Sequence, residues 1–125
     1  MLDEFFYCNH FVLLVGPPVV EIVHPALSTL RGVPASFTCH AEGFPLPTIK
    51  WMKQTDSVES EISANSAKFK INSHLGSSQL IVQNTSTADS GYYICKASNY
   101  VSDTARAFLG VVCKLYLNMW KPLVS

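Results

Sequence analysis

Residues 89–95, with the sequence Asp-Ser-Gly-Tyr-Tyr-Ile-Cys, constrain the fold of this chain more than any other stretch. Read with the period of two of a β-strand, Tyr93 and Cys95 fall on one face, and Tyr92 and Ile94 fall on the other. Gly91 precedes them, and a glycine there allows a tight entry into the strand. The stretch therefore predicts a turn followed by a half-buried strand whose inner face includes a tyrosine and a cysteine.

Several motifs upstream and downstream of this strand have a recognisable spacing. Cys39 lies 56 residues before Cys95, and Trp51 follows Cys39 by 12 residues. Residues 43–51 read Gly-Phe-Pro-Leu-Pro-Thr-Ile-Lys-Trp, and residues 95–99 read Cys-Lys-Ala-Ser-Asn. Over about residues 18–112, these motifs resemble the immunoglobulin superfamily, and more narrowly its I-set domains.

The resemblance implies an all-β fold, a two-sheet antiparallel Greek-key sandwich of the immunoglobulin type with an inter-sheet disulfide. It implies that Cys39 and Cys95 form this disulfide and that Trp51 packs against it. It also implies that the Tyr93 hydroxyl turns back to bond with upstream backbone. The core signature carried over from the family consists of Trp51, Asp89, Gly91 and Tyr93.

In many members of the family, an acid at the position of Asp89 pairs with a basic residue at the start of a strand. Lys68 stands where that basic residue would be. Because a lysine lacks the planar fork of an arginine, we expect a weak, partly exposed ion pair rather than a catalytic acid.

The pattern of apolar residues extends the fold along the chain. Residues 19–23 predict an edge strand that is interrupted at His24-Pro25, where the first strand of a sandwich commonly changes sheets. Alternation predicts further strands at residues 35–41, 49–51, 68–71, 78–83 and 103–112. Residues 54–67 are mostly polar, which predicts a solvated connection with room for a short strand.

At 125 residues the chain is long enough for one domain, which we place at residues 18–112. Residues 1–17 are interpreted as an N-terminal apolar extension or a degenerate signal segment, because they begin with acidic residues and lack a small-residue cleavage site. Residues 113–125 are interpreted as a C-terminal tail outside the domain, without a membrane span. Cys8 and Cys113 either form a second bridge or remain two unpaired thiols.

Composition argues against several classes of function. Nine basic and nine acidic residues cancel, so charge does not favour nucleic acid as the partner. The four histidines lie on different predicted segments, and no metal site or cofactor is expected. No strained nucleophile turn accompanies the serines, so we do not expect an enzyme.

The two outward faces of the predicted sandwich differ in chemistry. Residues that point outward from strands 35–41, 68–71 and 78–83 are nearly all polar, as expected for a face in water. The other face mixes aromatic, apolar and basic residues, which is typical of a protein-binding surface. Its predicted members are Lys50, Met52, Tyr92, Ile94, Lys96, Arg106 and Phe108. The alternative is that residues 54–67 or the C-terminal tail cover this face.

These observations leave two hypotheses for function. The first is an extracellular or cell-surface module, part or variant of a larger protein, that binds a protein ligand or a second copy of itself in adhesion, receptor or matrix recognition. In that case Asn84, which begins the sequon Asn-Thr-Ser, is a candidate for glycosylation. The second is a structural immunoglobulin module of an intracellular filament or scaffold protein, whose cysteines can stay reduced.

Overall fold

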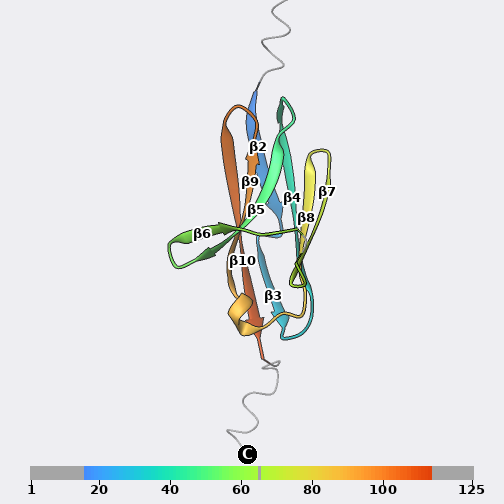
Figure 1. The fold of residues 1–125 in the computed structure, drawn as a ribbon, viewed down its shortest axis with the longest axis vertical. Helices are drawn as coiled ribbons and strands as arrows, with labels where there is room; N and C mark the ends of the chain where they lie inside the picture. The colour runs from blue at the N-terminus through green and yellow to red at the C-terminus, as the bar shows by residue number, and fades with distance from the viewer. Residues whose placement is uncertain (1–15, 65, 114–125) are drawn as a thin grey trace, which may run out of the picture.

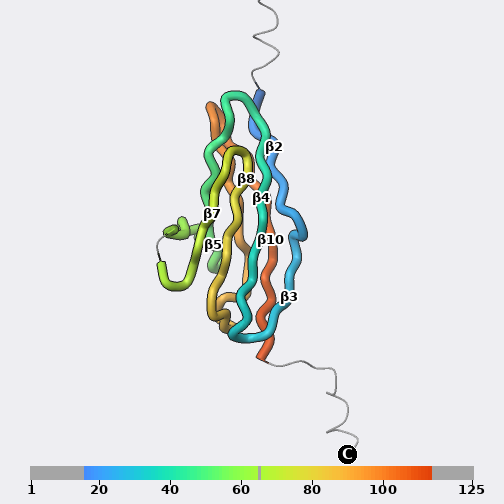
Figure 2. The backbone as a smooth tube through the Cα atoms, turned by 90° about the vertical axis from the view of Figure 1, so that its right-hand side faces the viewer, coloured from blue at the N-terminus to red at the C-terminus, as the bar shows by residue number. Residues whose placement is uncertain are grey.

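The computed structural model describes residues 16–64 and 66–113, which form two β-sheets packed face to face (Figure 1). One sheet has the strand order β3-β10-β9-β5-β6, and the other, which faces the viewer in Figure 2, has the order β2-β4-β8-β7. The strands are β2 (Gly16–Val23), β3 (Ala26–Leu30), β4 (Ala35–Phe44), β5 (Thr48–Thr55), β6 (Val58–Glu61), β7 (Phe69–His74), β8 (Ser77–Val82), β9 (Gly91–Ser98) and β10 (Ser102–Val112), with the 3₁₀ turn η1 (Thr87–Asp89) before β9. The predicted immunoglobulin-like sandwich is confirmed.

The first strand changes sheets at His24-Pro25, as predicted. β2 pairs with β4 in one sheet, whereas β3 pairs with β10 in the other. His24 has a φ of 56°, and Pro25, which has no N–H to donate, accepts a hydrogen bond from Phe108 N through its carbonyl (2.8 Å). The β3–β10 pairing is parallel, unlike the antiparallel pairings around it, because the chain continues in the same direction after crossing.

The core lies between the sheets and follows the predicted alternation. On β4, residues Ala35, Phe37, Cys39 and Ala41 are buried. On β10, alternate residues point to the same core, with Leu109 fully buried. Burial of aromatic and aliphatic side chains at about 25 cal/mol per Å² is the main stabilising contribution to such a sandwich.

The connection between β5 and β7 contains a short strand, β6, which the sequence analysis had allowed for within residues 54–67. β6 pairs with the end of β5, and this hairpin projects sideways from the sandwich (Figure 1). The expectation of a wholly solvated connection is wrong at Ile62, which is 6% exposed and donates its N–H to the Trp51 carbonyl (2.9 Å). Ile62 is flanked by polar residues and belongs to no apolar alternation, so its burial depends on tertiary packing.

The two ends of the described chain lie at opposite ends of the sandwich (Figures 1 and 2). β2 begins at Gly16, and β10 ends at Val112, followed by an exposed Cys113. Cys8, most of the predicted N-terminal extension and nearly all of the predicted tail lie outside the described residues. Across residues 16–64 and 66–113, no helix is long and apolar enough to cross a membrane.

Candidate protein-binding face

The inner face of β9 forms the predicted corner with η1. The Tyr93 hydroxyl donates a 2.6 Å hydrogen bond to the Asp89 carbonyl, and Tyr93 is fully buried. Asp89 Oδ2 accepts a hydrogen bond from Ser86 N (2.8 Å) and lies 2.6 Å from Lys68 Nζ. The Lys68 side chain is 33% exposed, so this is the partly exposed ion pair that the sequence predicted.

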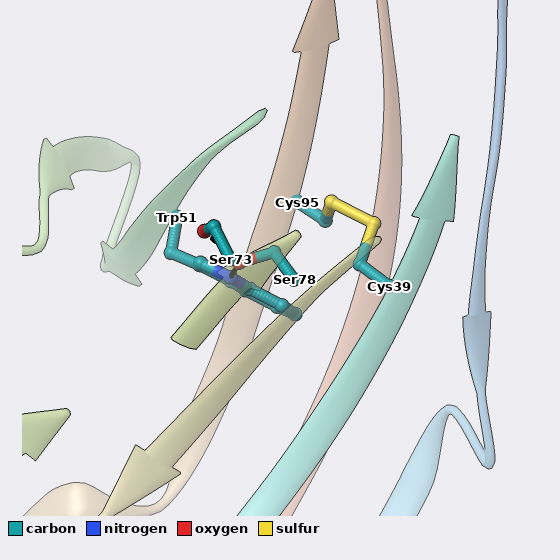
Figure 3. Close-up of a disulfide and its surroundings, with 5 residues drawn as sticks. All are labelled: Cys39, Trp51, Ser73, Ser78 and Cys95. Atoms are coloured by element: carbon teal, nitrogen blue, oxygen red, sulfur yellow. Dashed lines mark hydrogen bonds between the residues drawn. A yellow bond between two sulfur atoms is a disulfide. The ribbon is translucent and has the colours of Figure 1, made fainter. Parts of the chain in front are cut away.

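The disulfide and the tryptophan lie at the centre of the sandwich. Cys39 on β4 and Cys95 on β9 are bonded across the two sheets, and Trp51 stands opposite Cys95 in the β5–β9 register (Figure 3). The buried indole donates Nε1–H to Ser78 Oγ (2.9 Å), and the Ser73 hydroxyl lies 2.9 Å from Ser78 Oγ. The sequence did not predict this serine pair. It satisfies the indole N–H, which burial would otherwise leave without a partner.

Lys53 is a further residue whose role the sequence did not predict. It lies two residues after Trp51, so the alternation of β5 turns it toward the inner side, where its Nζ lies 4.6 Å from the centroid of the Tyr93 ring. Nζ donates to the Ser90 carbonyl (3.3 Å), in space that a side chain at Gly91 would occupy. Burial lowers the pKa of Lys53, and the negative charge of Asp89 acts in the opposite direction. The period of β5 was a usable signal for this placement.

The outward side of the five-stranded sheet brings together the seven residues of the predicted binding face. Lys50 and Met52 come from β5, Tyr92, Ile94 and Lys96 from β9, and Arg106 and Phe108 from β10. In the register, Met52, Ile94 and Arg106 form one row across the three strands. Tyr92 and Phe108 stand side by side in the next row, and Lys50 stands opposite Lys96 on the other side.

Three of these side chains stack on one another. The Tyr92 and Phe108 rings meet edge to face with centroids 5.2 Å apart. The Arg106 guanidinium lies 4.2 Å above the Tyr92 ring. Stacking of this kind limits the motion of each group. We call Tyr92, Arg106 and Phe108 the stacked trio.

One member of the predicted face does not contribute exposed surface. Ile94 points outward, but it is only 4% exposed, so its assignment as a contact residue is wrong. β9 is the middle strand of its sheet, and Ile94 stands between Met52 and Arg106, whose longer side chains lie on both sides of it. Alternation predicts the direction of a side chain but not whether its neighbours cover it.

The rest of the face is accessible among the described residues. Tyr92 is 39% exposed and Phe108 is 41% exposed. β6 was one of the segments expected to cover the face, but it lies beside β5 in the same sheet and all four of its residues are exposed. A groove of about 370 Å³ adjoins the stacked trio, between Tyr92, Phe108, Gln54 and Lys53.

The remaining candidates lie elsewhere. Asn84 is exposed in the turn that follows β8 of the four-stranded sheet, with a φ of 46°. Within the described ranges, no three His, Cys, Asp or Glu side chains come close enough together to hold a metal ion.

Comparison with known proteins identifies the family. A sequence profile described as "Immunoglobulin domain" matches residues 17–99. The chain belongs to the immunoglobulin superfamily. This immunoglobulin domain is 39% identical over 90 residues to hemicentin-2 of Mus musculus, covering 72% of the chain, and 31% identical over 98 residues to neural cell adhesion molecule 1 of Gallus gallus, covering 78%.

The chain corresponds to a small part of these relatives, 2% of hemicentin-2 and 9% of neural cell adhesion molecule 1. Among solved structures, it is similar to titin domain M7, with a TM-score of 0.66 and 28% sequence identity over 77% of this chain and 94% of that one. This immunoglobulin domain is therefore similar both to parts of adhesion proteins and to a domain of titin.

Proposed function

We propose that this immunoglobulin domain is a non-catalytic binding module of the I-set type, part of a larger extracellular protein, that recognises a protein partner in cell adhesion, receptor or matrix contact. The observation that carries the proposal is the stacked trio, exposed on the outward side of the five-stranded sheet. Its similarity to parts of hemicentin-2 and of a neural cell adhesion molecule supports the same class of function.

The chemistry of the face favours protein as the partner. Tyrosine and arginine are enriched among the residues that carry most of the binding energy at protein interfaces. Tyr92 and Arg106 are held by their mutual stacking, so less side-chain entropy is lost when a partner binds. The opposite sheet presents polar side chains, including the exposed Lys70, and provides an internal control surface.

Two features support an extracellular setting. The disulfide between Cys39 and Cys95 is of a kind that persists in oxidising compartments. Asn84 is exposed in the turn after β8 of the four-stranded sheet, so a glycan there would extend from the other sheet than the one that carries the binding face.

A hydrogen–deuterium exchange footprint tests the proposal once a panel of cell-surface and matrix proteins has yielded a binder. We expect protection of residues 92–96 and 104–108 on binding, with exchange in residues 36–40 and 70–72 unchanged. Protection confined to the four-stranded sheet would contradict the proposed face.

A second candidate function is a structural module of an intracellular filament or scaffold, favoured by the similarity to titin domain M7. In that setting Cys39 and Cys95 stay reduced and Asn84 carries no glycan. Intact-mass measurement of the chain from secreting cells, without reducing agent, separates the two. A loss of two protons assigned to Cys39 and Cys95, or a glycan at Asn84, supports the extracellular function.

A further inference from the structure

The seven residues of the binding face include three cations, although the whole chain has a formal net charge of zero. The cations are Lys50, Lys96 and Arg106, and none of the face residues on β5, β9 and β10 is acidic. The nearest acidic residues on the same side of the sheet are Glu59 and Glu61 on the adjoining β6, opposite Gln54 and Met52. Lys50 and Lys96 stand directly opposite each other in the β5–β9 register. Like charges in this arrangement destabilise a sheet, so the pair is not explained by folding.

Little within the described chain neutralises these cations. The ion pair of Lys50 with Glu61 is long, at 4.0 Å, and both side chains are mostly exposed, so it contributes little. Among residues 16–64 and 66–113, no carboxylate lies within ion-pair distance of Lys96 or Arg106. Two cations of the face are therefore available to carboxylates from outside.

The stacked trio contains one of these cations. The central carbon of the Arg106 guanidinium lies 4.2 Å from the centroid of the Tyr92 ring, and the N–H donors of a guanidinium match the geometry of a carboxylate. Phe108 is exposed beside it, where an apolar side chain can pack against its ring. The adjoining groove of about 370 Å³ is lined on its other side mostly by polar residues, among them Gln54 and Asp56.

We propose that the partner presents an acidic protein segment, with carboxylates binding at Lys50, Lys96 and Arg106 and an apolar side chain packing against Phe108. This inference rests on the proposed function and specifies the chemistry of the partner. A sulfated polysaccharide is the alternative polyanionic partner. It offers no apolar group for Phe108, whereas a protein segment can present carboxylates and an apolar side chain together.

The test begins with a random 12-residue peptide library displayed on phage and selected on the immobilised full chain. We expect selected peptides to be enriched in Asp and Glu together with Leu, Phe or Trp. The tightest peptide, its Glu→Gln twin and a heparin fragment are then titrated at 0.05 M and 0.5 M NaCl. We expect the acidic peptide to lose affinity at the higher salt, where charge interactions are screened within about 4 Å.

Substitution of a lysine on the binding face tests whether peptide binding depends on its positive charge. Lys96→Gln should weaken peptide binding by about fivefold or more, since hydrogen bonds between charged groups are among the stronger ones. The same change should raise the melting temperature, because it removes a like-charge pair. Lys70→Gln, an exposed lysine on the opposite sheet, is the matched control and should leave peptide binding unchanged.

The outcomes separate this inference from the proposed function. If selected peptides depend on Phe108 but show no acid enrichment and no effect of Lys96→Gln, the binding face stands and the acidic partner is wrong. If the heparin fragment binds in a Lys96-dependent manner and no peptide does, the partner is a polysaccharide and the inference is overturned. Peptide binding that is indifferent to both Phe108→Ala and Lys96→Gln would contradict the proposed face as well.

Discussion

Tyr92 and Tyr93 are neighbours in sequence with opposite environments. The Tyr93 hydroxyl is buried and bonded to the Asp89 carbonyl, whereas Tyr92 lies on the exposed face. We predict that Tyr93→Phe lowers the free energy of unfolding by about 1 kcal/mol or more, because the carbonyl loses its buried partner. Tyr92→Phe should be nearly neutral. Denaturant titration of both variants measures this, and equal losses would mean that the assignment of inner and outer faces is wrong.

Because the Tyr93 hydroxyl is buried, we also predict that the free energy of unfolding depends on pH. Burial, with the Asp89 charge adding to it, raises the pKa of Tyr93. In the unfolded chain a tyrosine ionises near pH 10, so above that pH the unfolded state loses a proton that the folded state keeps, and stability falls. The stability that Tyr93→Phe loses relative to the wild type should therefore be largest below about pH 10 and should decrease as the pH rises above that value. A constant difference from pH 8 to 11 would contradict this account.

At the scale of single residues, the sequence predicted whether a side chain points inward or outward better than it predicted how deeply that side chain is buried. The Tyr93 hydroxyl bonds to upstream backbone and Asp89 pairs with Lys68, as the resemblance implied, and Trp51 is buried in the core. The alternation also predicts the inward direction of Lys53 and the outward direction of Ile94. The burial of Ile94 and the contact of Lys53 with the Tyr93 ring could not be predicted in this way, because they depend on residues distant in sequence.

Among the elements, β4 and β9 are joined covalently, which leads to a prediction about stability. The disulfide closes a sequence separation of 56 residues. Replacing both cysteines, as Cys39→Ala with Cys95→Val, should lower the unfolding free energy by about 2–4 kcal/mol, because the unfolded chain regains its loop entropy. Cys113→Ser, at an exposed thiol, is the control and should have no effect on the unfolding transition. A double variant as stable as the control would show that the disulfide is not structural.

The sequence predicted most of the elements, but several strands are longer than predicted, as β5 is at Thr48–Thr55 against the predicted 49–51. Alternation revealed β4, β8 and β10, and Pro25 revealed the break between β2 and β3, because both signals are local. The parallel pairing of β3 with β10 and the burial of Ile62 could not be read in this way. Both arise from contacts between segments far apart in the chain.

For the molecule as a whole, the residues that stabilise the fold are different from those that we propose bind a partner. The disulfide and the core hold the sandwich together, and the outward side of β5, β9 and β10 is left to present aromatic and basic groups. The ends of the described chain lie at opposite ends of the sandwich (Figure 1). The central claim is that this face, and not the polar one, binds the partner.

Binding by face variants tests that claim most directly. Phe108→Ala and Arg106→Glu should keep the fold, since both side chains lie outside the core, yet weaken association with a partner or a second copy by about 1–3 kcal/mol. Lys70→Glu, on the opposite sheet, should change neither fold nor association. The measurement is binding to a panel of cell-surface proteins, with sedimentation for self-association. An equal loss for Lys70→Glu and Phe108→Ala would contradict the account.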